Sequence, residues 1–273
     1  MDTFTAFVTS HEPALRLAGF LAVLGLMAAA EVLWPKRPDA PRGRRWPVNL
    51  AIVAIDALTV RGLAFLLPAL LPVAAAALAA ERGWGLLPAI GIGGWAAFVL
   101  GVLMLDLAIY AQHVAFHKVP PLWRLHRMHH SDLAIDTTTG LRFHPVEIVI
   151  SIVIKVGLVV ALGLPAAAVV VFEVLLNATS LFNHANVALP GWLDRVLRLV
   201  LVTPDMHRVH HSVHRDETDS NFGFNVPWWD RLFGTYRAQP RDGHTGMTIG
   251  VSELRDPAKQ GLGGLLLQPF RKP

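Results

Sequence analysis

Three tight clusters hold eight of the thirteen histidines in this 273-residue chain. The clusters form one HxxxH and two HxxHH patterns, made by His113 and His117, by His126, His129 and His130, and by His207, His210 and His211. Residues three and four apart share one face of a helix, so each cluster can direct two or three imidazoles at one point. Imidazole is the commonest metal ligand, and one tetrahedral metal ion uses only four ligands. Eight imidazoles therefore predict two metal ions in one site.

The ligand chemistry narrows the choice of metal. All-imidazole sites suit iron, zinc, copper or nickel. The zinc-protease HExxH pattern is absent, because Val114 follows His113 and no histidine pair brackets a glutamate. The Glu-x-x-His pair of soluble di-iron bundles is absent as well. For the HxxxH pattern alone, a polar helix end at the membrane interface stays an alternative.

The composition predicts a polytopic membrane protein with a catalytic region on one side. Hydrophobic residues make up 53% of the chain and charged residues only 16%, against about 25% charged residues in soluble domains. The net charge of +4 is small and the basic residues lie near apolar segments, which indicates membrane orientation and no nucleic-acid partner. The absence of cysteine excludes disulfides, thiolate zinc sites, iron–sulfur clusters and a cysteine nucleophile.

Four apolar regions predict an all-α fold, a polytopic membrane helical bundle of about four spans. They are Leu17–Trp34, Val48–Leu71, Gly83–Leu105 and Val146–Phe182. The last region is long enough for two short helices, and Pro165 cannot continue a preceding helix. We therefore expect the last two spans to form a helical hairpin, either transmembrane or re-entrant. Leu17–Trp34 lacks a preceding basic segment and is expected to be a retained span, and the alanine-rich run Ala74–Ala80 predicts a short helix near the outer surface.

The loop Pro35–Pro47 decides the predicted orientation. It carries five basic residues against the single Asp39, so the positive-inside rule places it in the cytosol. Following the spans from there brings all three histidine clusters to the cytosolic face of an integral protein of the inner or cell membrane. The chain then divides into an N-terminal transmembrane region (1–112, three spans), the first two histidine clusters (113–145), the hairpin (146–183) and a cytosolic, histidine-rich cap with the third cluster (184–273).

The order HxxxH, HxxHH and distal HxxHH among membrane spans resembles the fatty acid hydroxylase / sterol desaturase superfamily. The resemblance covers about Asp106–Tyr236. Further matching pieces are Arg142–Pro145, Asn183–Asn186, Thr203–Met206, Asn221–Gly223 and Trp229–Tyr236. The resemblance implies a monooxygenase or desaturase of lipid metabolism with a non-haem di-iron centre. Such an enzyme uses O2 and external electrons to hydroxylate or desaturate a sterol, a fatty acid or a related lipid.

Carried over to this chain, the resemblance makes nine histidines ligands of two iron ions. They are His113, His117, His126, His129, His130, His184, His207, His210 and His211. His184, between the two HxxHH patterns, is a ligand on this ground alone. His144 resembles a further recurring histidine of the family, but its neighbour Pro145 indicates a structural role, or a supporting role beside the ligands, as readily as a ligand role. His11, His214 and His244 have no motif support and are expected to be solvated or locally hydrogen-bonded.

Polar residues near the clusters are candidates to support the ligands, since a ligating imidazole usually donates its outer N–H to a carboxylate, a carbonyl or a similar oxygen. The candidates are Asp106, Asp132, Glu147, Asn183, Asn186, Asp205 and Asn221. A helix cap or a surface position is the alternative for each of them. Four aromatic residues are candidates to line a lipid entrance or to anchor the cap at the membrane interface, with core packing of the cap as the alternative: Trp228, Trp229, Phe233 and Tyr236.

The electrons are expected from a separate protein. The chain has no cysteine for an iron–sulfur cluster and no GxGxxG fingerprint, so a ferredoxin, a cytochrome or a flavin reductase is implied. Five arginines near the clusters are candidates to dock an acidic donor: Arg124, Arg127, Arg195, Arg198 and Arg208. Arg127 and Arg208 lie inside the patterns and are equally candidates to orient the site. The lipid substrate is expected to enter from the bilayer.

Two other functions fit parts of the pattern. A zinc-dependent membrane hydrolase would use the same ligands and act without oxygen or reductant. A metal transporter or sensor would place its histidines along a path within the spans. The histidines of this chain instead gather at span ends and in loops, which favours the oxygenase.

Overall fold

The computed structural model describes residues 1–38 and 40–271, so Asp39 of the basic loop lies outside the described residues. Within these ranges the regular structure is helical, apart from two isolated bridges between extended residues. The α-helices are α1 (Asp2–Ser10), α2 (Glu12–Leu33), α3 (Arg45–Leu66), α4 (Pro72–Arg82), α5 (Leu86–Ala89), α6 (Gly94–Lys118), α7 (Pro120–His130), α8 (Pro145–Leu162), α9 (Ala166–Asn183), α10 (Gly191–Leu197), α11 (Pro204–His210), α12 (Arg215–Thr218), α13 (Trp228–Leu232), α14 (Gly243–Gly246) and α15 (Leu262–Leu267). Short 3-10 helices lie between them, namely η1 (Pro68–Leu70), η2 (Thr137–Leu141), η3 (Ser252–Leu254), η4 (Pro257–Gln260) and η5 (Gln268–Phe270). The predicted all-α fold is confirmed.

Five of the described helices are long and apolar enough to cross a membrane, namely α2, α3, α6, α8 and α9. The predicted count was about four, and the three N-terminal apolar regions together with the two helices expected from Val146–Phe182 account for these five candidates. α8 ends at Leu162, Gly163 adopts the left-handed conformation with a φ of 67°, and α9 begins after Pro165. The predicted hairpin is therefore confirmed. The short alanine-rich helix is confirmed as α4.

The third span begins later than the sequence indicated. The apolar region Gly83–Leu105 was expected to form it, but α6 begins at Gly94 and extends past both histidines of the HxxxH pattern. The preceding residues form turns around α5, because Gly83 and Gly85 have φ values of 65° and 112°, which a helix does not accommodate. A Cβ atom at Gly85 would also lie 2.1 Å from the backbone nitrogen of Gly163. The two turns therefore pack directly on each other.

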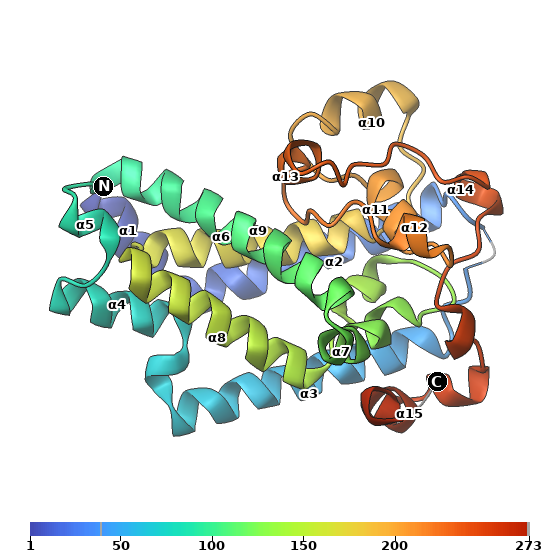
Figure 1. Ribbon diagram of the computed structural model, residues 1–273, viewed down its shortest axis with the longest axis horizontal. Helices are drawn as coiled ribbons and strands as arrows, with labels where there is room; N and C mark the ends of the chain where they lie inside the picture. The colour runs from blue at the N-terminus through green and yellow to red at the C-terminus, as the bar shows by residue number, and fades with distance from the viewer. Residues whose placement is uncertain (39, 272–273) are drawn as a thin grey trace.

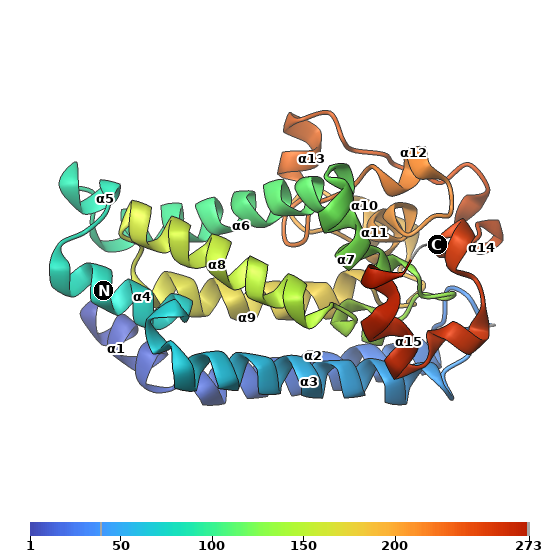
Figure 2. The same cartoon turned by 60° about the horizontal axis from the view of Figure 1, so that its bottom comes forward.

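The spanning helices lie lengthwise beside one another (Figure 1). In Figure 2, α2 and α3 run along one side of the bundle, α6 runs along the other side, and α8 and α9 lie between them. α9 is the central helix, since 56% of its apolar window is buried, against 6% to 33% for the other four helices. The short helices α1, α4 and α5 gather at one end, and the histidine-bearing helices α7 and α11 lie at the other end (Figure 1).

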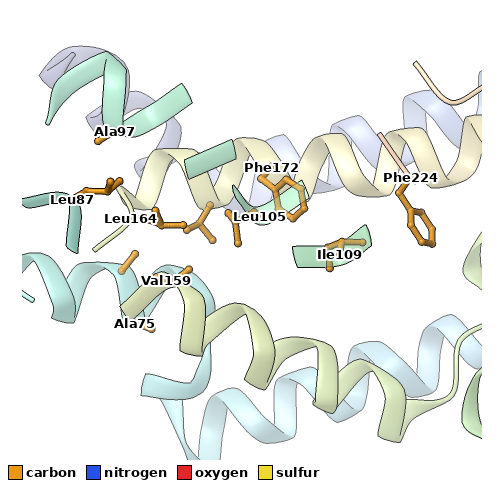
Figure 3. Close-up of a cluster of buried hydrophobic side chains, with 11 residues drawn as sticks. Ala75, Leu87, Ala97, Leu105, Ile109, Val159, Leu164, Phe172 and Phe224 are labelled. Atoms are coloured by element: carbon orange, nitrogen blue, oxygen red, sulfur yellow. The ribbon is translucent and has the colours of Figure 1, made fainter. Parts of the chain in front are cut away.

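Apolar packing fixes the relative positions of α6, α8 and α9. Leu105 on α6, Val159 on α8 and Phe172 on α9 are fully buried in one cluster, and Figure 3 shows this cluster extending along the bundle to Phe224. α6 and α9 approach closely, because a Cβ atom at Gly101 would lie 3.2 Å from the Cβ atom of Ala168. The packing brings the C-terminal ends of α6 and α9 to the same end of the bundle.

A buried charge cluster joins three spanning helices. Lys155 of α8 forms an ion pair with Glu173 of α9, and Arg16 of α2 contacts the same carboxylate. Lys155 and Glu173 are only 9% and 7% exposed. Charges within spans are normally paired, because an unpaired charge is costly to bury. The cluster therefore ties α2 to the α8–α9 hairpin.

Candidate metal centre

Four helices bring the histidines to one end of the bundle. The HxxxH pattern lies in the last two turns of α6, and the first HxxHH pattern ends α7. Pro120 begins α7 two residues after α6 ends, and a proline at this position favours a new helix start. His184 follows the last residue of α9. The second HxxHH pattern occupies α11 and its C-cap residue.

The nine histidines form two groups of buried imidazoles. In each group every residue offers one ring nitrogen, and these nitrogens lie within 4.8 Å of one another. The first group is His113, His117, His126, His130 and His210, and the second is His129, His184, His207 and His211. All nine residues are at most 3% exposed. The structure thus brings together every histidine that was predicted as a ligand, including His184.

Each HxxHH pattern contributes to both groups. On α7, His126 and His130 are four residues apart and share one face, which belongs to the first group, while His129 belongs to the second. On α11, His210 belongs to the first group and its neighbour His211 to the second. The groups adjoin, because the ring centroids of His130 and His211 are 4.5 Å apart. Two ions held in these groups would occupy one continuous buried site.

Hydrogen bonds at the outer nitrogens orient the rings. The Nδ1 atoms of His113, His184 and His210 lie 2.7 Å from the carbonyl oxygens of Phe222, Ser180 and Ser220, respectively. A carbonyl can only accept, so each Nδ1 carries the proton and donates it. The Nε2 atom of each ring then presents its lone pair toward its group. This is the tautomer that a metal-ligating histidine needs.

The inner nitrogens show why the groups fit metal ions. The Nε2 atoms of His113 and His126 lie 3.1 Å apart. Nδ1 of His126 lies 2.7 Å from a carboxylate oxygen of Glu147, so with ionised Glu147 both outer nitrogens are protonated. Two lone pairs then face each other without a proton between them. A bound cation removes this repulsion by accepting both lone pairs.

Unpartnered ring nitrogens support the same conclusion. Among the described residues, Nε2 of His117, His130 and His210 and both ring nitrogens of His211 are buried without a hydrogen-bond partner. A buried polar atom without a partner costs about 1–3 kcal/mol. A metal ion would give each of these atoms a partner. The donor set present therefore fits two metal ions.

Burial keeps these imidazoles neutral. It lowers the pKa of His126 to about 3 and that of His184 to about 4. The pKa values of His129, His130 and His211 are also well below the ordinary value, because of burial first and of neighbouring imidazoles second. Neutral imidazole is the form that binds a metal, so no proton has to be displaced at neutral pH.

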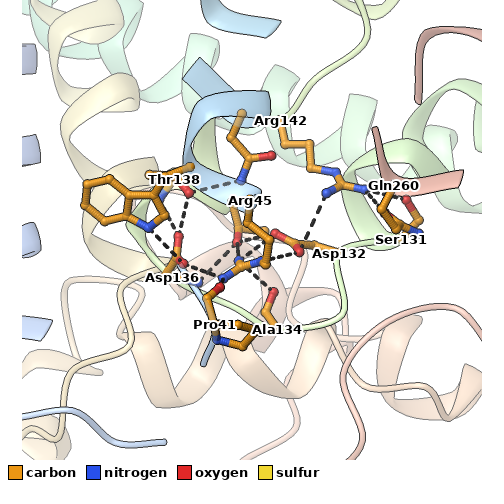
Figure 4. A network of polar contacts seen from close by, with 12 residues as sticks. Pro41, Arg45, Ser131, Asp132, Ala134, Asp136, Thr138, Arg142 and Gln260 are labelled. Carbon is orange, nitrogen blue, oxygen red and sulfur yellow. Dashed lines mark hydrogen bonds and ion pairs between the residues drawn. The ribbon is translucent and has the colours of Figure 1, made fainter. Parts of the chain in front are cut away.

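A polar network fixes the segment that follows α7 (Figure 4). Arg45 donates to Asp132 at 2.7 Å and to Asp136 at 2.6 Å. Arg142 donates to the carbonyl of Met128, inside the first HxxHH pattern, at 3.0 Å. Burial alone would raise the pKa of Asp132, but the guanidinium groups of Arg45 and Arg142 lower it to about 2. The network anchors the start of α3 to the histidine-bearing end of α7.

Comparison with known proteins now assigns the chain to a family. The family model described as fatty acid hydroxylase matches residues 98–235. These residues contain all nine histidines of the two groups. The chain belongs to the fatty acid hydroxylase family.

The curated relatives of this fatty acid hydroxylase family member have names that refer to enzymes acting on lipids or aldehydes. Ornithine lipid hydroxylase OlsE of Rhizobium tropici is 31% identical over 64% of this chain and 50% of its own length. Alkylglycerol monooxygenase of Homo sapiens is 31% identical over 58% of this chain and 34% of its own. Very-long-chain aldehyde decarbonylase GL1-1 of Oryza sativa subsp. japonica is 30% identical over 58% of this chain and 26% of its own. The chain thus spans half or less of these relatives, and no solved structure gives a significant match.

The predicted supporting residues divide into two kinds in this family member. Glu147 contacts a ligand imidazole directly, as described above. Others hold neighbouring segments in place: Asp106 accepts from the side-chain Nε1 of Trp229 at 2.7 Å, and Asn183 donates to the backbone carbonyl of Phe224 at 3.0 Å. Asn221 has a φ of 52° and donates to the carbonyl of Met206, within α11, at 2.9 Å.

Three further candidates lie at the edge of the centre. Asn186 makes hydrogen bonds with both backbone groups of Arg37, at 3.0 and 2.8 Å. Asp205 pairs with Lys36 at 2.8 Å and with Arg208. His144 lies outside both groups and caps α8, because its Nδ1 accepts from the amide of Val146 at 3.2 Å. Of the roles left open for His144, this geometry supports the structural one.

Two carboxylates beside the centre were not identified from the sequence. Asp219 lies 3.4 Å from Nδ1 of His117. Asp230 accepts from the amides of Phe222 and Gly223 at 2.8 and 2.9 Å, and so fixes the carbonyl that binds His113. Asp230 lies inside the matching piece Trp229–Tyr236, which was a signal for it. Asp219 lies outside the matching pieces, so the sequence did not point to it.

The predicted docking surface for an electron donor is largely wrong. Of the five arginines, Arg127, Arg198 and Arg208 are buried, at 5%, 6% and 0% exposure. Arg127 donates to the carbonyls of Gln268 and Arg271. These three guanidinium groups hold the fold together and cannot meet a partner protein. Arg124 and Arg195 are exposed.

Glu147 offers a direct test of ligand support. We expect Glu147→Ala to weaken metal binding by about a hundredfold and Glu147→Gln by about tenfold, because loss of an outer partner typically costs 10–100-fold in affinity and the glutamine oxygen still accepts. Competition with a chelator measures this affinity. Glu253→Gln, an exposed position with the same change of charge, is the matched control. Wild-type affinity in Glu147→Ala would show that the carboxylate does not support His126.

Proposed function

We propose that the chain is a membrane-bound di-iron oxygenase that hydroxylates or desaturates a lipid. The observation that carries this proposal is the pair of adjoining groups of five and four buried imidazoles at the end of a spanning bundle. Structural zinc is satisfied by four ligands, and nine imidazoles in two groups exceed that need. Relatives named lipid hydroxylase and monooxygenase support oxygen chemistry.

In this proposal the protein positions the imidazole ligands and keeps water away from the metal centre. When bound, reduced iron supplies the chemistry that activates O2 toward an unreactive C–H bond. The carbonyls of Phe222, Ser180 and Ser220, together with Glu147, orient the imidazoles. Phe143 stacks on His129 with centroids 4.5 Å apart, and Phe224 lies 5.0 Å from His113. These aromatic walls continue into the apolar cluster among the spans (Figure 3), which suits a substrate chain that comes from the bilayer.

The proposed orientation places the site on the cytosolic face of the inner or cell membrane. The basic loop after α2 lies at the same end as the histidines, because Lys36 pairs with Asp205 and Arg45 pairs with Asp132. The positive-inside rule that places this loop in the cytosol therefore supports the same side for the centre. A separate ferredoxin, cytochrome or flavin reductase would supply electrons there, and the exposed Arg124 beside the centre is a candidate contact for it.

Product analysis tests the proposed activity. Purified protein loaded anaerobically with iron is mixed with a lipid extract, a surrogate reductase and O2, and the lipids are analysed by mass spectrometry. We expect products with one added oxygen atom or with two hydrogens lost, and none when O2 or reductant is omitted. A zinc hydrolase would instead release products from zinc-loaded protein without O2. That result would overturn the oxygenase proposal.

A further inference from the structure

An open cavity with charged residues in its wall lies in the cap, outside the two histidine groups. Its volume is about 530 Å³ and its lining includes residues of α10, of the segment before α14, and of the loop after α2. Within its lining, Lys36 pairs with Asp205 at 2.8 Å and Arg198 pairs with Asp194 at 2.7 Å, and Arg195 adds a third cation. The cavity therefore has a net positive charge. Tyr236, Gln239 and His244 add further polar groups to the wall.

Two arginines line this cavity, one exposed and one buried. Arg198 is only 6% exposed, pairs with Asp194 at 2.7 Å through Nε and donates to the carbonyl of Ala238 at 2.8 Å, but its Nη2 has no hydrogen-bond partner among the described residues. Arg195 is exposed, and its side chain forms no ion pair or hydrogen bond within the described part of the chain. A buried guanidinium nitrogen without a partner is costly. Oxygen atoms of a phosphate or carboxylate group would satisfy it.

The helix that lines the cavity has an apolar outer side. On α10 and the residues that follow it, Trp192, Val196, Leu199 and Val200 are 56% to 66% exposed. α13 adds Leu232 and Phe233 at 68% and 55% exposure. Trp228 on α13 donates to the carbonyl of Leu199 at 2.8 Å, so the two segments form one surface, which we call the α10–α13 surface.

The α10–α13 surface continues the apolar exterior of a span. Phe233 stacks on Tyr110 of α6 with centroids 5.5 Å apart, and α13 lies beside the C-terminal half of α6 in Figure 2. Tryptophan and other aromatic residues next to a span end are typical of the membrane interface. On the other side of the cavity, Lys36 follows the end of α2 by three residues. The cavity therefore lies at the level of the lipid headgroups.

We propose that this cavity binds the phosphate of an anionic membrane lipid. Arg195 and the free nitrogen of Arg198 would donate to the phosphate oxygens, and the α10–α13 surface would rest among the acyl chains. Asp205 on α11 also lines the cavity, so the bound headgroup lies beside the helix that carries His207. The site goes beyond the proposed oxygenase activity, because none of its lining residues belongs to the histidine groups.

Native mass spectrometry of the detergent-purified full chain tests the proposal. The protein is titrated with phosphatidylglycerol and with phosphatidylcholine of the same acyl chains. We expect phosphatidylglycerol to bind more tightly than phosphatidylcholine by about tenfold, because both lipids offer a phosphate but choline adds a positive charge that the net positive cavity repels. Arg195→Ala removes one cation from the lining and should abolish this preference. Arg198→Lys keeps the charge but loses the guanidinium group, and we expect it to weaken the binding of phosphatidylglycerol as well.

Matched controls separate this site from diffuse charge attraction and from the metal centre. Arg44→Ala changes another exposed arginine, one that does not line the cavity, and should bind phosphatidylglycerol like the wild type. His129→Ala should also bind it like the wild type, whatever becomes of the metal. Equal binding of the two lipids, or equal weakening by Arg44→Ala and Arg195→Ala, would overturn the proposal. Displacement of the lipid by inorganic phosphate at equal concentration would assign the cavity to a soluble anion instead.

Discussion

His129→Ala should strip the protein of most of its metal and abolish oxygenation. The wild-type chain is expected to hold about two iron ions, one in each histidine group. His129 belongs to the group of four, so its loss leaves three imidazoles, whereas His210→Ala leaves four imidazoles in the group of five. We therefore expect His129→Ala to lose more iron than His210→Ala. Plasma mass spectrometry gives the iron content, and Mössbauer spectroscopy shows whether the remaining iron is coupled.

A matched histidine variant provides the control. His214 lies close to the second HxxHH pattern in sequence but pairs with Asp242 at 3.0 Å and belongs to neither group. His214→Ala should keep the wild-type iron content and activity. Unchanged iron in both His129→Ala and His210→Ala would remove the basis of the two-metal proposal. Stoichiometric zinc in the protein after anaerobic iron loading would favour the alternative function, a zinc-dependent hydrolase.

Gly140→Ala should damage the second histidine group without touching a ligand. A Cβ atom at this position would lie 2.6 Å from the carbonyl oxygen of Ser180 and 3.0 Å from Nδ1 of His184. These two atoms form the 2.7 Å hydrogen bond that orients His184. We expect the free energy of unfolding to fall by about 1–3 kcal/mol, as overpacking typically costs, and metal affinity to fall by about 10–100-fold, as loss of an outer partner typically costs.

The control for Gly140→Ala is Gly157→Ala on α8, where a Cβ atom meets nothing within 4 Å. Alanine in a helix is about 1 kcal/mol more favourable than glycine, so this variant should be as stable as the wild type or more stable. Thermal unfolding and chelator competition measure both effects. If Gly140→Ala melted and bound metal like the wild type, the close packing of η2 against α9 would not support the centre.

Much of the site could be predicted because it depends on local spacing. Histidines three and four apart share a helix face wherever the helix lies, so the HxxxH and HxxHH patterns predicted converging imidazoles, and the structure brings them together. The spans followed from length and hydropathy in the same way. His184 has no such pattern of its own. It was predicted by the resemblance alone, and its place in the second group depends on how α9 packs.

The remaining features depend on tertiary contacts that leave no sequence signal. Three of the outer partners of the ligands are backbone carbonyls, at Phe222, Ser180 and Ser220, and every residue has a carbonyl. The arginines expected on the surface are mostly buried, because the fold supplies them with carbonyl and carboxylate partners. The third span was placed too early because hydropathy does not distinguish an apolar turn from an apolar helix.

The sharing of each HxxHH pattern between both histidine groups has a thermodynamic consequence. His129 and His130 are neighbours on α7 but face different groups, and so are His210 and His211 at the end of α11. An ion in one group would fix the helix ends from which the other group draws its ligands, so part of the ordering cost of the second site would be met when the first ion binds. Linkage then requires each ion to raise the affinity for the other by the same factor. The centre should fill cooperatively, passing from empty to doubly occupied with little of the singly loaded form.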